Sequence, residues 1–398
     1  MRVVLNGLAA LKPKTGVGHH VADLTAALVA GYPDDAFTLY PGETVSRWVA
    51  SANRGGAGTA GGHGGLRRRL LSGVKSAGKT LAKAACGLHF GGYTRAFRFD
   101  LYHEPNFVPF RAHLPMVVTV HDLSVLKFPH WHPADRVAYH HRHFLRGLGF
   151  ARHVIVVSEA VRRELIHELG FPPERVTAVH NGVGPQFVPQ SPEVVARVRR
   201  ELGVPEKFFL CVGTIEPRKN LGTVIRAFAD LPPQVRAACP LVLAGPWGWR
   251  SEDDRKLFDE IGIPAGVRHL GYVPSELLPA LYSAARVLLY PSHYEGFGLP
   301  PVEMMACGGA VIASTADAVR EVVGRCGKLV TPDDLEGWRE AMRVAATDDE
   351  FVAGLCRGGV ARAAEFTWPR AARETMAVYR QVLGLPLQVP DTSARAAA

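Results

Sequence analysis

No uncharged apolar run in this sequence approaches the roughly 18 residues that a membrane-spanning helix needs. The first residues, Met1–Gly7, turn polar too soon for a secretion signal and are instead typical of a first strand. We therefore expect the protein to stay in the cytoplasm, where it is either free or attached to the inner face of the cell membrane.

Cysteine is scarce, and no two cysteines form a C-x-x-C pair. Zinc sites and disulfide frameworks need close, paired spacing, so this distribution argues against both. We expect reduced structural thiols at all six positions: Cys86, Cys211, Cys239, Cys307, Cys326 and Cys356.

Charge is unbalanced, because 46 lysines and arginines face 37 acidic residues and leave a net charge of +9. An excess of this size indicates an anionic partner. Charge alone leaves nucleic acid, anionic lipid and a nucleotide diphosphate open. The hydrophobic share of 47% is that of a globular protein, and 398 residues predict two domains.

Short apolar runs alternate with amphipathic segments of helix length, which is the pattern of parallel α/β architecture. The pattern restarts after a turn-rich stretch at 181–192, so we predict one Rossmann-like domain over 1–185 and a second over 186–368. The predicted strands are Arg2–Leu8, Phe37–Tyr40, Leu101–His103, Met116–Val120, His153–Val157, Arg175–Val179, Phe208–Val212, Leu241–Ala244, Val267–Leu270, Val287–Tyr290, Ala310–Ala313 and Lys328–Val330. Ligands of such folds bind at the carboxyl ends of the strands.

The clearest motif runs from Tyr290 to Glu303 and joins a buried strand, a glycine-bearing loop and a helix start. Gly296 and Gly298 allow backbone amides to approach a ligand, and the new helix offers unpaired N–H groups to a phosphate. Glu303 could accept hydrogen bonds from a ribose, and Glu295 could reach a sugar. The alternative is that both glutamates are surface residues that satisfy the helix dipole.

A second motif, Gly213–Asn220, follows the strand Phe208–Val212 and contains two adjacent cations, Arg218 and Lys219. Arginine grips phosphate oxygens with two donors and lysine adds a point charge, so the pair suits a diphosphate leaving group. The alternative is a solvated basic turn.

The first half offers weaker signals. Gly16 and Gly18 follow the first strand in a loop that resembles a phosphate-approach loop but lacks the full dinucleotide spacing. His121 follows the strand Met116–Val120 and so faces the same cleft, where it could act near a sugar's reacting carbon.

A glycine-dominated segment, Arg54–Gly65, leads into a basic amphipathic stretch at 66–83. Such a stretch can lie on an anionic membrane surface, or its apolar stripe can pack on its own domain. The end of the chain, 386–398, is predicted to be a frayed tail.

Taken in order, the motifs resemble those of the retaining glycosyltransferases of family 4, which have the GT-B fold. The matching landmarks span nearly the whole chain: Gly16–Gly18, Val118–Asp122, Val156–Glu159, His180–Val183, Val212–Asn220, Gly271–Pro274, Glu295–Glu303 and Glu321–Gly324. The resemblance also implies that a final helix, within 369–385, crosses back onto the N-terminal half.

The resemblance implies a role for each site residue. His121 would sit at the anomeric centre and Glu295 would contact the donor sugar. The donor site would comprise Gly16, Gly18, Arg218, Lys219, Gly296, Phe297, Gly298, Leu299 and Glu303. Members of this fold generally need no metal, and the sequence has no Asp-x-Asp metal motif. We therefore expect no cofactor beyond the sugar nucleotide, and the resemblance leaves the route to retention open.

The phosphate-loop variant resembles that of bacterial mannosyl- and rhamnosyltransferases of polysaccharide assembly. It points to GDP-mannose as donor and to a polyprenyl-diphosphate-linked oligosaccharide or other glycan as acceptor, with UDP- or dTDP-sugars as the alternative. Sugar-nucleotide 2-epimerases share the fold but lack this paired-glutamate loop. A nucleotide-sugar-binding scaffold is the non-enzymatic alternative. Nucleic acid is not expected, because the basic residues lack interleaved aromatics.

We predict that replacing Arg67, Arg68 and Arg69 with glutamine weakens binding to anionic vesicles, because each basic residue near such a surface contributes about 1 kcal/mol. Binding would be measured by vesicle sedimentation, with neutral vesicles as the control. If binding to anionic vesicles is unchanged, the 66–83 stretch has no membrane role.

Overall fold

The computed structural model describes residues 1–11, 16–42 and 86–386. The predicted membrane-binding stretch at 66–83 and nearly all of the predicted tail lie outside these residues. Within them, no helix is both long and apolar enough to cross a bilayer.

The described strands form two parallel six-stranded sheets, which confirms the predicted α/β fold with two Rossmann-like halves. The N-terminal half has the strand order β2-β1-β3-β4-β5-β6, and the C-terminal half has β12-β11-β10-β7-β8-β9. The strands are β1 (Arg2–Asn6), β2 (Ala36–Tyr40), β3 (Leu101–Glu104), β4 (Met116–Val120), β5 (His153–Val156), β6 (Val176–Ala178), β7 (Phe209–Val212), β8 (Leu241–Ala244), β9 (Arg268–His269), β10 (Val287–Tyr290), β11 (Ala310–Ser314) and β12 (Lys328–Val330). All twelve were predicted, and β1, β6 and β9 are each two residues shorter than expected.

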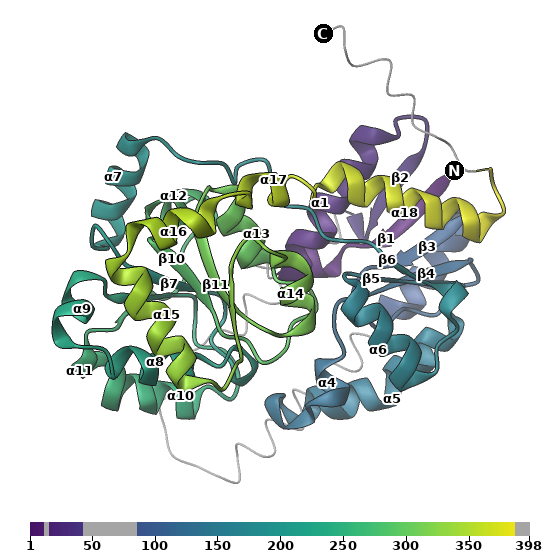
Figure 1. The fold of residues 1–398 in the computed structure, drawn as a ribbon. Helices are drawn as coiled ribbons and strands as arrows, with labels where there is room; N and C mark the ends of the chain where they lie inside the picture. The colour runs from purple at the N-terminus through teal and green to yellow at the C-terminus, as the bar shows by residue number, and fades with distance from the viewer. Residues whose placement is uncertain (12–15, 43–85, 387–398) are drawn as a thin grey trace, which may run out of the picture.

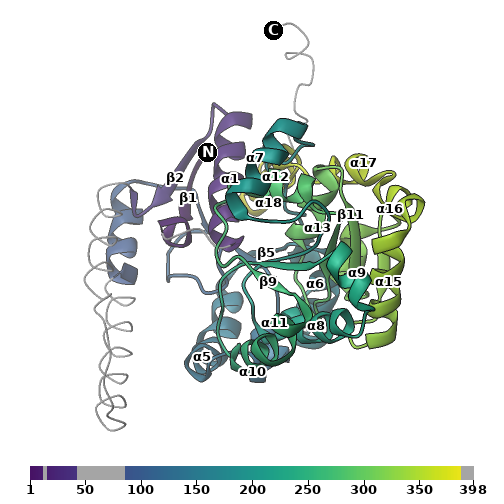
Figure 2. The same cartoon turned by 90° about the vertical axis from the view of Figure 1, so that its left-hand side faces the viewer.

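Helices cover the sheets in both halves, and Figure 1 shows the halves side by side. Residues 86–96 are also helical. The labelled helices are α1 (Gly16–Gly31), α4 (Ser124–Lys127), α5 (Ala134–Phe150), α6 (Glu159–Leu169), α7 (Pro192–Leu202), α8 (Leu221–Ala229), α9 (Pro233–Ala238), α10 (Glu252–Leu257), α11 (Ile263–Ala265), α12 (Leu278–Ala284), α13 (Leu299–Ala306), α14 (Asp317–Val323), α15 (Leu335–Thr347), α16 (Asp349–Cys356), α17 (Gly359–Ala363) and α18 (Trp368–Leu383). Helices α15 and α16 lie on the side of the C-terminal half that faces away from β1 and β2 (Figure 2).

Each sheet has an apolar core on both faces, as parallel sheets require. The strands therefore consist of near-continuous apolar runs; all five residues of β4 are buried. One core of the N-terminal half is completed by the end of the chain, because α18 packs against α1 and contributes Met376 and Tyr379. Figure 1 shows α18, in yellow, lying across that half.

Two local details concern the starts of helices. Ser158 caps the helix after β5, since its side chain accepts a hydrogen bond from the Val161 amide. Gly16 and Gly18 were expected in a loop, but α1 already begins at Gly16. Gly16 and Gly18 therefore lie in the first turn of α1 rather than in a loop. The first amides of a helix have no partner within it, so these glycines still sit where N–H groups are available.

Candidate functional site

The C-terminal sheet reverses its strand order between β7 and β10, and ligands of doubly wound folds bind at such a point. The loops that follow these two strands are fastened together. The His293 amide donates to the Arg218 carbonyl at 2.9 Å, and the Asn220 side chain donates to the Pro291 carbonyl at 3.2 Å. The two predicted donor motifs thus form one structural unit.

A compact charge cluster occupies this unit. Arg218 contacts the Glu295 carboxylate through Nη1, and its Nε lies 2.6 Å from Glu216 Oε1. Lys219 Nζ lies 2.6 Å from the other oxygen of Glu295, which also accepts a hydrogen bond from Ser292 at 2.7 Å. Two cations and two carboxylates therefore balance each other, so this is not the solvated basic turn that was the alternative.

Burial and pairing set the protonation of this cluster. Burial alone would raise the pKa of Glu295, but Arg218 and Lys219 outweigh it and lower that pKa to about 2. Burial dominates at Glu216, whose pKa is raised, and at Lys219, whose pKa is lowered. Glu295 is thus a firmly ionised group that holds two donors in place.

The loop after Glu295 touches the N-terminal half at Gly296. A Cβ atom built on Gly296 would lie 1.7 Å from the His121 carbonyl oxygen, so only glycine permits this approach. The close approach places the His121 backbone directly against the glycine loop.

The next residues begin helix α13. Gly298 has φ +114° and precedes Leu299, the first residue of that helix. The Phe297 side chain is 4% exposed and belongs to the core of the C-terminal half, so it can face a donor only through its backbone. The amides of Gly298 and Leu299 remain suited to binding an anion, whereas Pro300 and Pro301 have no N–H to offer.

Glu303 lies one turn into α13 and does not join the charge cluster. Its Oε2 accepts a hydrogen bond from Tyr282 at 2.7 Å. Burial raises the pKa of Glu303 to about 7, and the Tyr282 bond opposes this only in part.

The His121 ring is held in one orientation. Its Nε2 lies 2.8 Å from the Pro105 carbonyl, which can only accept a hydrogen bond, so Nε2 carries the proton. Burial lowers the pKa of His121, which favours the neutral ring and leaves Nδ1 as an acceptor. The ring of His20, on α1, packs edge-on against it with the centroids 4.7 Å apart.

Gly16 and Gly18 lie in the first turn of α1, the helix that also carries His20. No atom of the described residues lies within 4 Å of a Cβ built on Gly16.

Sequence reasoning missed three contributors: Glu216, Tyr282 and His20. Glu216 lies within a quoted motif, yet nothing in its spacing indicates that it is 2% exposed and paired with Arg218. Tyr282 is far from Glu303 in the sequence, and His20 has no motif context. In the described ranges, no group of three or more His, Cys, Asp or Glu side chains is placed to hold a metal ion.

Two family models match the chain: "Glycosyltransferase Family 4" over residues 15–187 and "Glycosyl transferases group 1" over residues 196–354. The O-antigen chain mannosyltransferase B of Escherichia coli is 31% identical over 92% of this chain and 96% of its own length. The chain belongs to glycosyltransferase family 4. A serotype-specific mannosyltransferase of E. coli, WbdA, is 28% identical over 58% of this chain but only 29% of its own length.

The solved structure of HepE from Anabaena, in complex with UDP and glucose, matches with a TM-score of 0.67 at 21% identity. The match covers 96% of this chain and 99% of that one. At this identity the likeness concerns the fold, and it confirms the GT-B arrangement expected of a family 4 glycosyltransferase.

We predict that Glu303→Gln raises the free energy of unfolding, relative to wild type, more at pH 8 than at pH 5. The pKa of Glu303 rises from 4.5 to about 7 on folding, so the native state keeps a proton that the unfolded chain has lost. The free energy of unfolding of the wild type therefore falls as the pH rises above 4.5. The loss reaches its full size above pH 7, where Glu303 is ionised in both states. A glutamine side chain has no such cost and can still accept a hydrogen bond from Tyr282.

Urea unfolding at both pH values measures this effect, with the exposed Glu201→Gln as control. The gain at pH 8 should be of order 1–3 kcal/mol. Equal effects of Glu303→Gln at pH 5 and pH 8 would show that Glu303 is ionised across this range.

Proposed function

We propose that this glycosyltransferase transfers a mannosyl residue from GDP-mannose to a glycan acceptor in cell-surface polysaccharide synthesis, with retention of the anomeric configuration and without a metal. The observation that carries the proposal is the near full-length similarity to an O-antigen mannosyltransferase at 31% identity. The second mannosyltransferase match supports the same sugar.

The charge cluster supports binding of the donor diphosphate. Arg218 and Lys219 are only 18% and 13% exposed, so they are held in place with little freedom to lose on binding. A diphosphate would take over the donors that Glu295 now engages, and the amides of Gly298 and Leu299, just before Pro300, would add further hydrogen bonds. The released Glu295 carboxylate could then accept hydrogen bonds from sugar hydroxyls.

The remaining donor contacts follow from position. Glu303 would bind the ribose hydroxyls, with Tyr282 fixing the orientation of its carboxyl group. The close approach of His121 to Gly296 places the N-terminal half against the loop that would hold the sugar. The His121 region would therefore lie by the anomeric carbon, and Gly16 and Gly18 would bring amides of α1 towards the donor.

In the proposed reaction, the bond between the anomeric carbon and the diphosphate oxygen breaks and a bond to an acceptor hydroxyl oxygen forms. The acceptor hydroxyl gives up its proton to solvent, and the departing nucleoside diphosphate carries away the electron pair of the broken bond. Arg218 and Lys219 would stabilise the negative charge that develops on the diphosphate.

A UDP-sugar is the second candidate donor, because the structurally similar HepE binds UDP and glucose. None of the contacts among the described residues distinguishes guanine from uracil. For the acceptor we propose a polyprenyl-diphosphate-linked oligosaccharide or another glycan. The basic 66–83 stretch would bring the enzyme to the inner face of the membrane that carries such a lipid.

A donor screen with EDTA present tests this proposal. Release of nucleoside diphosphate is followed for GDP-, UDP- and dTDP-sugars with wild type and Glu303→Ala, and lipid-linked acceptors are included. We expect release from GDP-mannose at pH 8, where Glu303 with its pKa of about 7 is ionised, reduced about 10- to 100-fold by Glu303→Ala because a hydrogen bond to a charged group is lost.

If nucleoside diphosphate is released only from a UDP- or dTDP-sugar, that sugar nucleotide is the donor instead of GDP-mannose. If EDTA abolishes the activity, the proposed metal independence is contradicted. If no sugar nucleotide in the panel releases its nucleoside diphosphate, the non-catalytic scaffold is favoured. Glu374→Gln, on α18 and outside the cleft, serves as the matched carboxylate control.

A further inference from the structure

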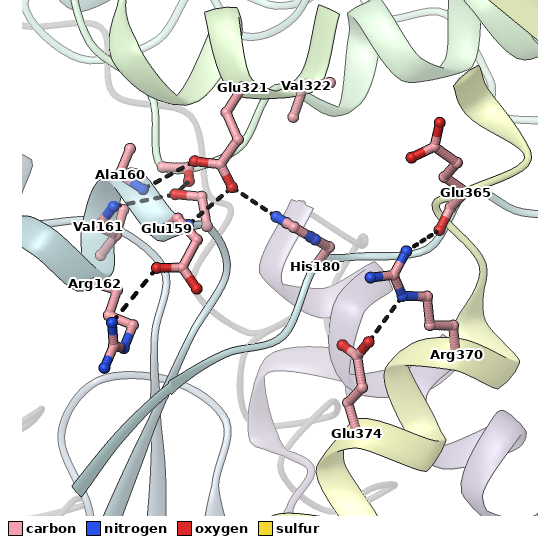
Figure 3. Close-up of polar contacts among 12 residues, drawn as sticks. Glu159, Ala160, Val161, Arg162, His180, Glu321, Val322, Glu365, Arg370 and Glu374 are labelled. Atoms are coloured by element: carbon pink, nitrogen blue, oxygen red, sulfur yellow. Dashed lines mark hydrogen bonds and ion pairs between the residues drawn. The ribbon is translucent and has the colours of Figure 1, made fainter. Parts of the chain in front are cut away.

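Three family landmarks have no part in the donor site described above: Val156–Glu159, His180–Val183 and Glu321–Gly324. They come from β5 and α6, from the segment that leaves the N-terminal half, and from α14 of the C-terminal half. Figure 3 shows that they converge on a single joint.

Glu321 is the centre of this joint. Its two carboxylate oxygens accept hydrogen bonds from the backbone amides of Glu159 at 2.8 Å and Ala160 at 2.9 Å (Figure 3). These are the first amides of α6, which have no partner within their own helix. A side chain of one half thus caps a helix of the other half, at the end where the helix dipole favours negative charge.

His180 supports the same carboxylate from a third direction. Its Nε2 lies 2.6 Å from Glu321 Oε1. Burial opposes ionisation of Glu321, but the hydrogen bonds from His180, Glu159 and Ala160 outweigh burial and lower its pKa. Glu321 is therefore a charged acceptor that is fully engaged between the halves.

Ser158 links this joint to the proposed donor site through hydrogen bonds. Its hydroxyl is fully buried, accepts from the Val161 amide at 3.2 Å and donates to the Gly296 carbonyl at 2.7 Å. The Gly296 carbonyl and the Phe297 amide belong to one planar trans peptide, so they point in opposite directions. A bond that fixes the carbonyl therefore also fixes the direction of the Phe297 N–H.

The two passages of chain between the halves run beside this joint. The Val183 amide donates to the Phe366 carbonyl at 2.9 Å, and Val183 pairs with Thr367. A Cβ atom on Gly182 would lie 2.3 Å from the Trp368 nitrogen, so the two passages are in close contact. Any rotation of one half against the other about these passages must break or remake the bonds of Glu321 and Ser158.

We propose that Glu321, His180 and Ser158 form an interdomain latch that holds the halves closed and orients the Gly296–Phe297 peptide towards the donor. Glu321 and Ser158 are positioning residues, since they act through the α6 amides and through Gly296. The latch itself rests on contacts alone; its effect on transfer rests on the proposed function.

The test compares Glu321→Gln and Ser158→Ala with Glu374→Gln. Glu374 is a suitable control because its carboxylate pairs with Arg370 one turn away on the same helix (Figure 3). This ion pair does not link one half of the protein to the other. Glutamine at 321 keeps the shape of the side chain, but its NH₂ group cannot accept a hydrogen bond from the second α6 amide.

The first readout needs no substrate. Hydrogen exchange at the amides of Glu159 and Ala160, in nucleotide-free protein, should become about tenfold faster or more in Glu321→Gln and stay unchanged in the control. Small-angle X-ray scattering should show a larger radius of gyration for Glu321→Gln. If Glu321→Gln folds and has the same amide exchange rates and the same radius of gyration as wild type, the latch is overturned. If Glu321→Gln does not fold, faster exchange at Phe297 in Ser158→Ala supports the latch, and unchanged exchange overturns it.

The second readout is transfer. Both latch variants should lower kcat/KM for the donor by about tenfold, which is the loss expected for one hydrogen bond to a charged or oriented group. Altered exchange with wild-type kcat/KM would overturn the positioning role. If wild type transfers no sugar at all, the proposed function fails, while exchange and scattering still decide the latch.

Discussion

The ion pairs of Arg218 and Lys219 with Glu295 are the interaction on which the site depends. Two cations held this close, with little exposure, would repel each other and lack hydration unless carboxylates were present. Glu295 supplies the main counter-charge and Glu216 completes it. Because the cations follow β7 and the carboxylate follows β10, the same pairs fasten together the two loops at the point where strand order reverses. The same ion pairs therefore both neutralise the two cations and hold the two loops in place.

The balance has a consequence for ligand binding. Under the proposed function, a diphosphate would not meet an open positive patch; it would exchange with Glu295 for the same donors. Such an exchange would leave Glu295 free at the place where the sugar is proposed to lie. The N-terminal half closes this region from the other side, through the His121 backbone against Gly296, through the Ser158 hydroxyl, and through the α6 amides that bind Glu321 of the C-terminal half. The site is complete only when both halves are in contact.

The sequence predicted the strands well, because buried parallel strands are short apolar runs bounded by turns, and Met116–Val120 is such a run. It also located the loop residues, since Arg218, Lys219 and Glu295 directly follow such runs. It could not show that these residues neutralise one another, because pairing between loops about 75 residues apart depends on strand order rather than spacing. For the same reason it missed Tyr282 as the partner of Glu303. The start of α1 was misplaced because glycines were taken as loop residues, although the structure has them in a first helical turn.

A crystal structure of the protein with bound GDP-mannose would show whether the diphosphate exchanges with Glu295. We expect the diphosphate within hydrogen-bonding distance of Arg218 and Lys219, the ribose on Glu303, and the Glu295 carboxylate turned from the two cations towards the sugar. A nucleotide bound elsewhere, or bound at this cleft with both ion pairs of Glu295 intact, would contradict this expectation.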